Sequence, residues 1–162
     1  MGILEKILSP KTRASLGILY FGLTKVPMIL YVRPSVVEIS AERVVLKVPL
    51  KRRTKNHLGS MYFGALAVGA DCTAGIFAVR WIRQRSEPIS LIFKDLKAAF
   101  LRRAEGDVYF TCTQGRAISA LVSKAAESDE RVELPIHVKA TVPDLSDEPV
   151  ADFSLTLSLK KK

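Results

Sequence analysis

The chain has 162 residues, which is the usual size of one domain and is enough to bury a sizeable core. Apolar residues make up 48% of it and charged residues 25%, and these values are those of a globular chain and exclude a disordered one. The formal net charge of +9 favours anionic partners: nucleic acid, an acidic membrane surface or a phosphate-bearing small molecule.

Residues 1–32 predict a helical segment at the start of this single domain, 1–162. Ser9-Pro10 has the N-cap and first-turn residues of a helix, and Pro27 stops or kinks that helix. The segment Ala14–Val32 carries one charge, Lys25, over 19 residues, which is long enough for a membrane span. Because Lys25 and Pro27 interrupt it, we interpret it as an amphipathic helix that covers the core.

Alternating apolar and polar side chains predict five or six strands over the rest of the chain. Most are joined by short turns, and one polar face on each strand indicates an antiparallel sheet with one face towards the core. A short amphipathic helix is expected to begin at Gly115. The predicted strands are Ser35–Ser40, Arg43–Leu50, Ser90–Leu101, Val108–Thr113, Arg131–Ala140 and Asp152–Leu159.

One apolar segment, Met61–Trp81, is long enough for a helix of five or six turns. It is apolar on all sides, which predicts a helix buried within the fold. Its glycines suggest that another backbone or a ligand comes close; they are Gly64, Gly69 and Gly75. Asp71 lies in the middle, and a carboxylate there must be paired, hydrogen-bonded, shifted in pKa or used in chemistry.

One long helix among such strands is an α+β arrangement that resembles the hot-dog fold, a curved antiparallel sheet wrapped around a central helix. The chain is most similar to acyl-CoA thioesterases of the phenylacetate-pathway type, in particular to an uncharacterised thioesterase-like branch. In that family an asparagine precedes a helix that opens His-Gly-Gly, and an acidic residue follows two to three turns later. Here Tyr62-Phe63-Gly64 fall on His-Gly-Gly. The residues that carry the resemblance are Asn56, Gly59-Ser60, Gly64-Ala65-Leu66 and Asp71.

The resemblance implies hydrolysis of an acyl-CoA thioester without a cofactor, by a homodimer or a tetramer. Asp71 would be the base or nucleophile, facing the other subunit, and the amides of Phe63 or Gly64 would form the oxyanion hole. Asn56 and Ser90 would position water or substrate. Tyr62 replaces the histidine of the family and can still donate a hydrogen bond to the substrate.

Each of these residues also has a purely structural interpretation. Asp71 could be a buried structural carboxylate that caps a break in the helix or is bonded to a hydroxyl such as that of Thr73. Asn56 could be a helix-entry cap, and Phe63 could be part of the core. A nucleophilic Cys72 would need a nearby histidine. Cys72 and Cys112 lie in apolar contexts without the spacing of metal ligands, so we expect them to be free thiols of a reducing, cytoplasmic compartment, without metal.

Clustered basic residues could meet the phosphates of coenzyme A or could form a solubilising surface. They lack interleaved aromatic side chains, so we expect no nucleic-acid partner. These residues are Lys51, Arg52, Arg53, Arg102 and Arg103.

Two other functions remain open: an acyl-CoA or fatty-acyl binding protein without catalysis, and a structural partner in an assembly. The acyl chain and its carrier, coenzyme A or acyl carrier protein, are also open. We expect no membrane partner, although residues 1–32 could either seal the mouth of a pocket or touch a membrane.

Overall fold

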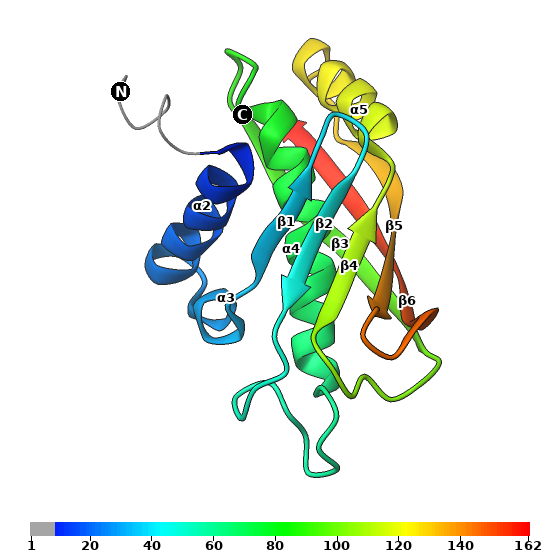
Figure 1. Cartoon of the computed structure of the whole chain (residues 1–162). Helices are drawn as coiled ribbons and strands as arrows, with labels where there is room; N and C mark the ends of the chain where they lie inside the picture. Colours follow the sequence, from blue (N-terminus) through cyan, green and yellow to red (C-terminus); the bar gives the residue numbers. More distant parts are fainter. Residues whose placement is uncertain (1–8) are drawn as a thin grey trace.

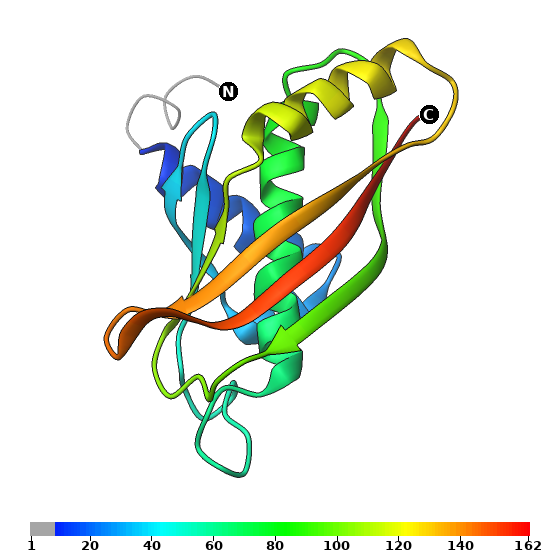
Figure 2. The same ribbon diagram turned by 90° about the vertical axis from the view of Figure 1, so that its right-hand side faces the viewer.

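The computed structural model describes residues 9–162 as one six-stranded antiparallel sheet curved around a central helix (Figure 1). The strand order is β1-β2-β4-β5-β6-β3, and α4 lies against the concave side of the sheet (Figure 2). This is the predicted hot-dog arrangement with extra N-terminal helices. The elements are α2 Pro10–Thr24, α3 Pro27–Val32, β1 Ser35–Ile39, β2 Val44–Val48, α4 Phe63–Ile82, β3 Ile89–Phe100, β4 Val108–Cys112, α5 Gly115–Glu127, β5 Val132–Val142 and β6 Ser146–Lys161.

The N-terminal segment forms a hairpin of two helices, α2 and α3, beside β1 (Figure 1). As predicted, Ser9 caps α2, because its hydroxyl accepts a hydrogen bond from the Thr12 amide at 3.3 Å. The two helices touch at Gly22, where an added Cβ would lie only 2.7 Å from the Leu30 nitrogen. The prediction of an amphipathic helix is wrong, because α2 has apolar side chains on its outer face as well as its inner one.

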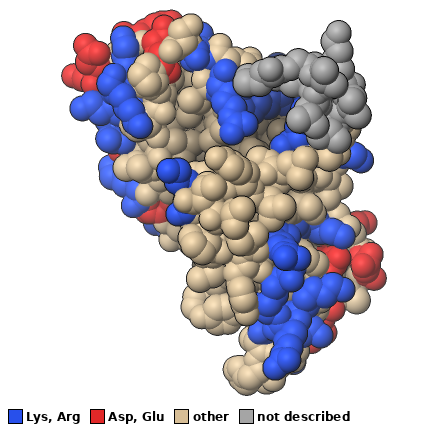
Figure 3. All heavy atoms as spheres, turned by 90° about the vertical axis from the view of Figure 1, so that its left-hand side faces the viewer, with Lys and Arg blue, Asp and Glu red and all other residues tan. Residues whose placement is uncertain are grey.

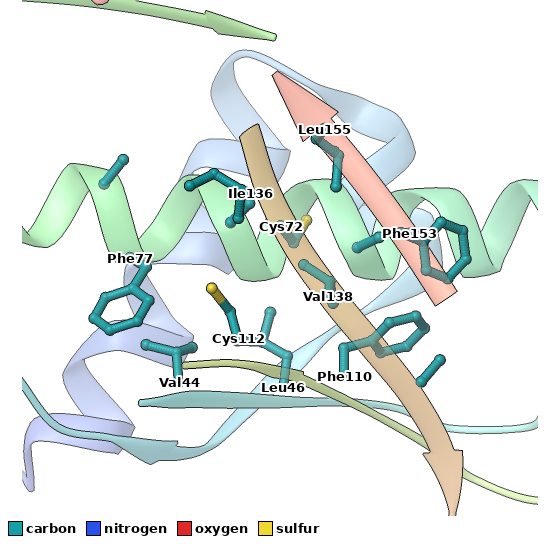
Figure 4. Packing of buried hydrophobic residues seen from close by; sticks show 14 of the residues in the cluster. Val44, Leu46, Cys72, Phe77, Phe110, Cys112, Ile136, Val138, Phe153 and Leu155 are labelled. Carbon is teal, nitrogen blue, oxygen red and sulfur yellow. The ribbon is translucent and has the colours of Figure 1, made fainter. Parts of the chain in front are cut away.

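Helix α4 packs into the core, as its composition predicts, and its buried residues lie between Ala65 and Ala78. Phe77 of the helix and Phe110 of β4 are fully buried, and they pack with side chains of β2, β5 and β6 (Figure 4). An added Cβ on Gly69 would lie 2.4 Å from the Phe110 ring. The close neighbour of this glycine is therefore an aromatic side chain rather than another backbone or a ligand. Within residues 9–162, α4 is the one helix long and apolar enough to cross a membrane, and half of its most apolar stretch is buried inside the fold.

Strand β3 lies at one end of the sheet and pairs with β6 over its length. Leu96 lies opposite Leu155 and Phe100 lies opposite Ala151, so these side chains share the face that packs on α4. Leu155 and Ala151 are buried, whereas Leu96 and Phe100 are exposed. The free edge of β3 therefore carries apolar side chains of the inner face that residues 9–162 cover only in part.

Candidate active site

Asp71 lines a cavity of about 320 Å³ between α4, the α2–α3 hairpin and β3. Both the helices and the strand contribute apolar walls, so the carboxylate faces a mostly apolar space. Arg83, at the C-terminal end of α4, is the one cation among the residues of the described chain that line it. The apolar lining consists of Gly17, Ile18, Phe21, Val26, Ile29, Cys72, Gly75, Ile76, Val79, Leu91, Ile92 and Phe93.

The Asp71 carboxylate has no hydrogen-bond or ion-pair partner among residues 9–162. The hydroxyl of Thr73 donates to the Gly69 carbonyl at 2.7 Å, and no hydrogen bond joins it to the Asp71 carboxylate. Burial raises the pKa of Asp71 above its ordinary value, because no neighbouring charge or donor compensates the lost hydration. A half-buried carboxylate with a raised pKa is a stronger base than one in water.

Cys72 lies next to Asp71 and lines the same cavity, but its environment opposes a thiolate. Burial raises the pKa of the thiol, and the negative charge of Asp71 raises it further. His57 and His137 are exposed and line other parts of the surface. The expectation of a free, non-nucleophilic thiol at Cys72 agrees with these surroundings.

A second, open hollow of about 600 Å³ lies at the N-terminus of α4. The first helical amides, those of Phe63 and Gly64, have no acceptor among the described residues, and Tyr62 makes no side-chain capping bond. Free N–H groups at a helix start carry partial positive charge and can stabilise an oxyanion. The hollow is lined by Asn56, His57, Leu58, Ser60, Met61, Tyr62, Phe63, Leu66, Phe100, Leu101, Arg102, Arg103 and Ala104.

Two of the predicted substrate-positioning side chains at this hollow have structural partners. The Asn56 amide donates to Ser60 at 3.0 Å and its oxygen accepts from the Leu58 amide at 2.9 Å, so Asn56 shapes the loop before the helix. The Tyr62 ring lies over Gly64, where an added Cβ would come within 2.6 Å of it. Tyr62 also contacts the Phe63 ring, with centroids 4.6 Å apart.

The remaining predicted site residues lie apart from Asp71. The Ser90 hydroxyl donates to the Lys160 carbonyl at 2.9 Å, and Ser90 lines neither hollow. Arg102 is ion-paired with Glu148 at the rim of the second hollow, and Arg103 lies beside it. A third hollow, which contains Tyr31, is lined by the other basic group, Lys51, Arg52 and Arg53.

One chain does not bring Asp71 and the helix-terminal amides together. Asp71 follows Phe63 by eight residues on the same helix, and a rise of about 1.5 Å per residue puts them about 12 Å apart along its axis. Sequence reasoning also missed most of the cavity wall, including Phe21 from α2, Phe93 from β3 and Arg83. The one sequence signal for that wall was the apolar stretch from Leu16 to Leu23 in α2.

The fold is the hot-dog fold, and the solved structures that share it include proteins described as thioesterases. A Pseudomonas aeruginosa protein of unknown function, described as a probable thioesterase, has 22% identity and a TM-score of 0.74 over 95% of this chain and 97% of its own. A Haemophilus influenzae thioesterase has 14% identity and a TM-score of 0.64 over 88% of each chain. A mutant thioesterase, also from Pseudomonas aeruginosa, has 12% identity and a TM-score of 0.68 over 95% of this chain and 96% of its own.

The chain belongs to the family described as domain of unknown function DUF4442, whose model matches residues 18–159. No curated protein matches the sequence.

Proposed function

We propose that the protein is an acyl-CoA thioester hydrolase in which Asp71 is the catalytic base. The observation that carries the proposal is the Asp71 carboxylate, which lines an apolar cavity without a partner among residues 9–162. A carboxylate is costly to bury in this way, and ionisable groups whose pKa is shifted by burial in a cavity are characteristic of active sites.

In this reaction Asp71 takes a proton from water, and the resulting hydroxide attacks the thioester carbonyl carbon. The carbonyl oxygen becomes an oxyanion, which accepts hydrogen bonds from the free amides at the start of α4. Collapse of this intermediate releases the thiol, which takes up the proton, and leaves a carboxylic acid. Direct attack by Asp71, which gives a mixed anhydride that water then cleaves, is the other route to the same products.

The site needs a second copy of the chain, because Asp71 and the amides of one chain are about 12 Å apart. The free β3 edge, with exposed Leu96 and Phe100, is the surface that supports a homodimer. Pairing two β3 edges about a twofold axis perpendicular to the sheet runs the two α4 helices antiparallel. The N-terminus of one α4 can then approach Asp71 of the other.

Arg103 and Arg102 are the residues we propose for the phosphates of coenzyme A. They lie at the rim of the hollow that contains the free Phe63 amide, so a phosphate there can be connected to a thioester at the helix start. Arg102 is already ion-paired with Glu148, so a bound phosphate would compete with that carboxylate, while Arg103 lies 4.0 Å from Glu105.

A non-catalytic acyl-CoA binding protein is the second candidate, and one observation favours it. The Tyr62 ring lies over Gly64, next to the amides that would bind the oxyanion. If the ring stays there when a thioester binds, the same cavity holds the acyl chain without hydrolysis.

The test is a panel of acyl-CoAs mixed with the wild-type protein, with free thiol as the readout. Asp71→Asn should lower turnover at least about tenfold, the minimum expected for loss of a general base, while the dimer persists in gel filtration. The matched control is Asp144→Asn, at an exposed position in the turn between β5 and β6. Binding without turnover in the wild type would support the binding protein. Absence of both would contradict both candidates and leave a structural role in an assembly.

A further inference from the structure

The outer face of the α2–α3 hairpin is apolar and uncovered. Its side chains, which we call the hairpin face, are between 42% and 69% exposed: Leu16, Leu19, Tyr20, Leu23, Met28 and Tyr31. The opposite face of α2 buries Ile18 and Gly22, so the stretch from Leu16 to Leu23 of this surface helix is apolar on both sides. A helix of that composition is expected to have a partner on both sides, and contiguous exposed apolar patches mark interaction sites.

Cations border the hairpin face, and acids are absent from it. Between Ser9 and Val37 the sequence has four cations and no aspartate or glutamate. Lys25 lies between the two helices and Arg33 directly follows α3; both are exposed, and neither is ion-paired within residues 9–162. Arg52 and Arg53 share a hollow with Tyr31. Figure 3 shows a broad uncharged surface on this side, with Lys and Arg gathered above and below it.

The charges decide which partner fits. A second copy seated on the hairpin face would make a twofold contact, which places the same cations opposite each other with no acid between them. An anionic lipid surface supplies the missing negative charge, and its apolar interior accepts leucine and methionine side chains. Tyr20 and Tyr31 have an apolar ring and a polar hydroxyl, which suits the boundary between headgroups and acyl chains.

We propose that the α2–α3 hairpin docks the protein on an anionic membrane surface, with the hairpin face in the lipid and Lys25, Arg33 and Arg52 at the headgroups. The hairpin lies in the interface and does not span the bilayer, since α2 has 15 residues and α3 has six.

The hairpin is also the wall between that surface and the Asp71 cavity. Phe21 of α2 and Ile29 of α3 line the cavity from the inner side, while Tyr20 and Met28, their neighbours in sequence, belong to the hairpin face. In a docked protein the hairpin would therefore be the layer that separates the cavity from the lipid. Docking itself goes beyond the proposed hydrolysis and does not depend on it, because Asp71 takes no part in it.

Flotation of the full chain with lipid vesicles tests the proposal. One set of vesicles is phosphatidylcholine alone, and the other is phosphatidylcholine with phosphatidylglycerol. We expect at least about tenfold stronger binding to the anionic set, and loss of that preference in high salt. Equal binding to both sets, or binding to neither, overturns the proposal; an acidic protein surface would then be the partner to seek.

Two matched pairs of variants locate the contact. Leu23→Ser should weaken vesicle binding about tenfold, whereas Leu145→Ser, in the turn between β5 and β6, should leave it unchanged. The two leucines are similarly exposed, 67% and 63%, so both variants should fold.

Lys25→Glu should weaken binding at least about fivefold, and Lys124→Glu on α5 should not. If the control of either pair weakens binding as much as its partner, the hairpin face is not the docking surface. Asp71→Asn should bind vesicles like the wild type even if hydrolysis is absent.

Discussion

Gly75 and Phe93 are neighbours in the wall of the cavity that Asp71 lines. A Cβ added to Gly75 would have Phe93 as its nearest neighbour, at 3.8 Å from Cε2, which is an ordinary van der Waals contact. Gly69, six residues earlier on α4, differs, because a Cβ there would lie 2.4 Å from the Phe110 ring. One glycine therefore keeps a cavity open, and the other makes room for a core side chain.

These two glycines should respond in opposite ways to alanine. Gly75→Ala should raise the free energy of unfolding by up to about 1 kcal/mol, because alanine favours the helix and meets no clash. Gly69→Ala should lower it by about 1–3 kcal/mol, because the methyl group displaces the buried Phe110 ring. Urea denaturation of both variants measures the difference. A loss of stability in both would show that the cavity at Gly75 is filled in solution.

A larger side chain at Gly75 should block the cavity. We expect Gly75→Leu to weaken binding of an acyl-CoA at least about tenfold, because burial of a chain of a few methylenes is lost. Isothermal titration with the acyl-CoA that binds the wild type best is the measurement. Ala117→Leu, at an exposed position of α5, is the control with the same added side chain type. Unchanged affinity in Gly75→Leu would place the acyl chain elsewhere.

The sequence predicted the sheet well because most strands bury one face. In β2, for example, Val44, Leu46 and Val48 are all fully buried, and their spacing of two residues is visible without a structure. Asp71 was also visible, as the one acid in a long apolar segment. Both signals come from residues that are close in sequence, so they can be recognised without knowing which distant segments pack together.

The rest of the site depends on contacts between distant segments. The glycines of α4 predicted close approach but could not say that Gly69 meets a ring from β4 while Gly75 faces a cavity. The residues next to Ser90 in the sequence do not show that its hydroxyl donates to the Lys160 carbonyl, because the pairing of β3 with β6 makes these two residues neighbours. In the same way, Arg53 and Arg103 each follow another arginine in the sequence, but they line different hollows in the structure.

Asp71 and Asp107 should shift stability with pH in opposite directions. Burial raises the pKa of Asp71, so the native state holds its proton more tightly than the unfolded chain does, and stability falls as pH rises through that raised pKa. Asp71→Asn should therefore be more stable than the wild type at neutral pH, and its advantage should shrink as pH falls through the raised pKa and be gone below the ordinary aspartate value.

Asp107 is the comparison in the same protein. It accepts a hydrogen bond from the Leu50 amide at 2.9 Å and lies 3.2 Å from Lys47, and these contacts lower its pKa. Its contribution to stability is present above the ordinary aspartate pKa and is lost as pH falls through the lowered value. Asp107→Asn should thus be less stable than the wild type at neutral pH. Thermal unfolding of both variants across pH is the measurement, and parallel curves would contradict the assignment for Asp71.

Neither cysteine should react in the native protein. Cys72 and Cys112 are buried, and burial raises the pKa of both thiols, so little thiolate is present at neutral pH. Mass spectrometry after brief treatment with iodoacetamide should find both unmodified, while the denatured chain should carry two adducts. Rapid alkylation of Cys72 alone would mean that the cavity admits water and reagent and that the thiol is activated there.

The free β3 edge should decide the oligomeric state. Leu96 is 42% exposed although Leu155, directly across from it on the same face, is buried, which is the pattern expected where a second chain completes the core. Leu96→Lys should convert a dimer into a monomer, because two like charges would meet in an otherwise apolar contact about the twofold axis. Val37→Lys is the control: Val37 is also 42% exposed, but it lies on β1 at the opposite end of the sheet.

Sedimentation equilibrium measures the mass of each variant, and thiol release from acyl-CoA measures its hydrolytic activity. If the proposed site combines Asp71 of one chain with the α4 amides of the other, the monomeric variant should lose hydrolysis while Val37→Lys keeps it. A folded Leu96→Lys monomer with full activity would show that one chain suffices.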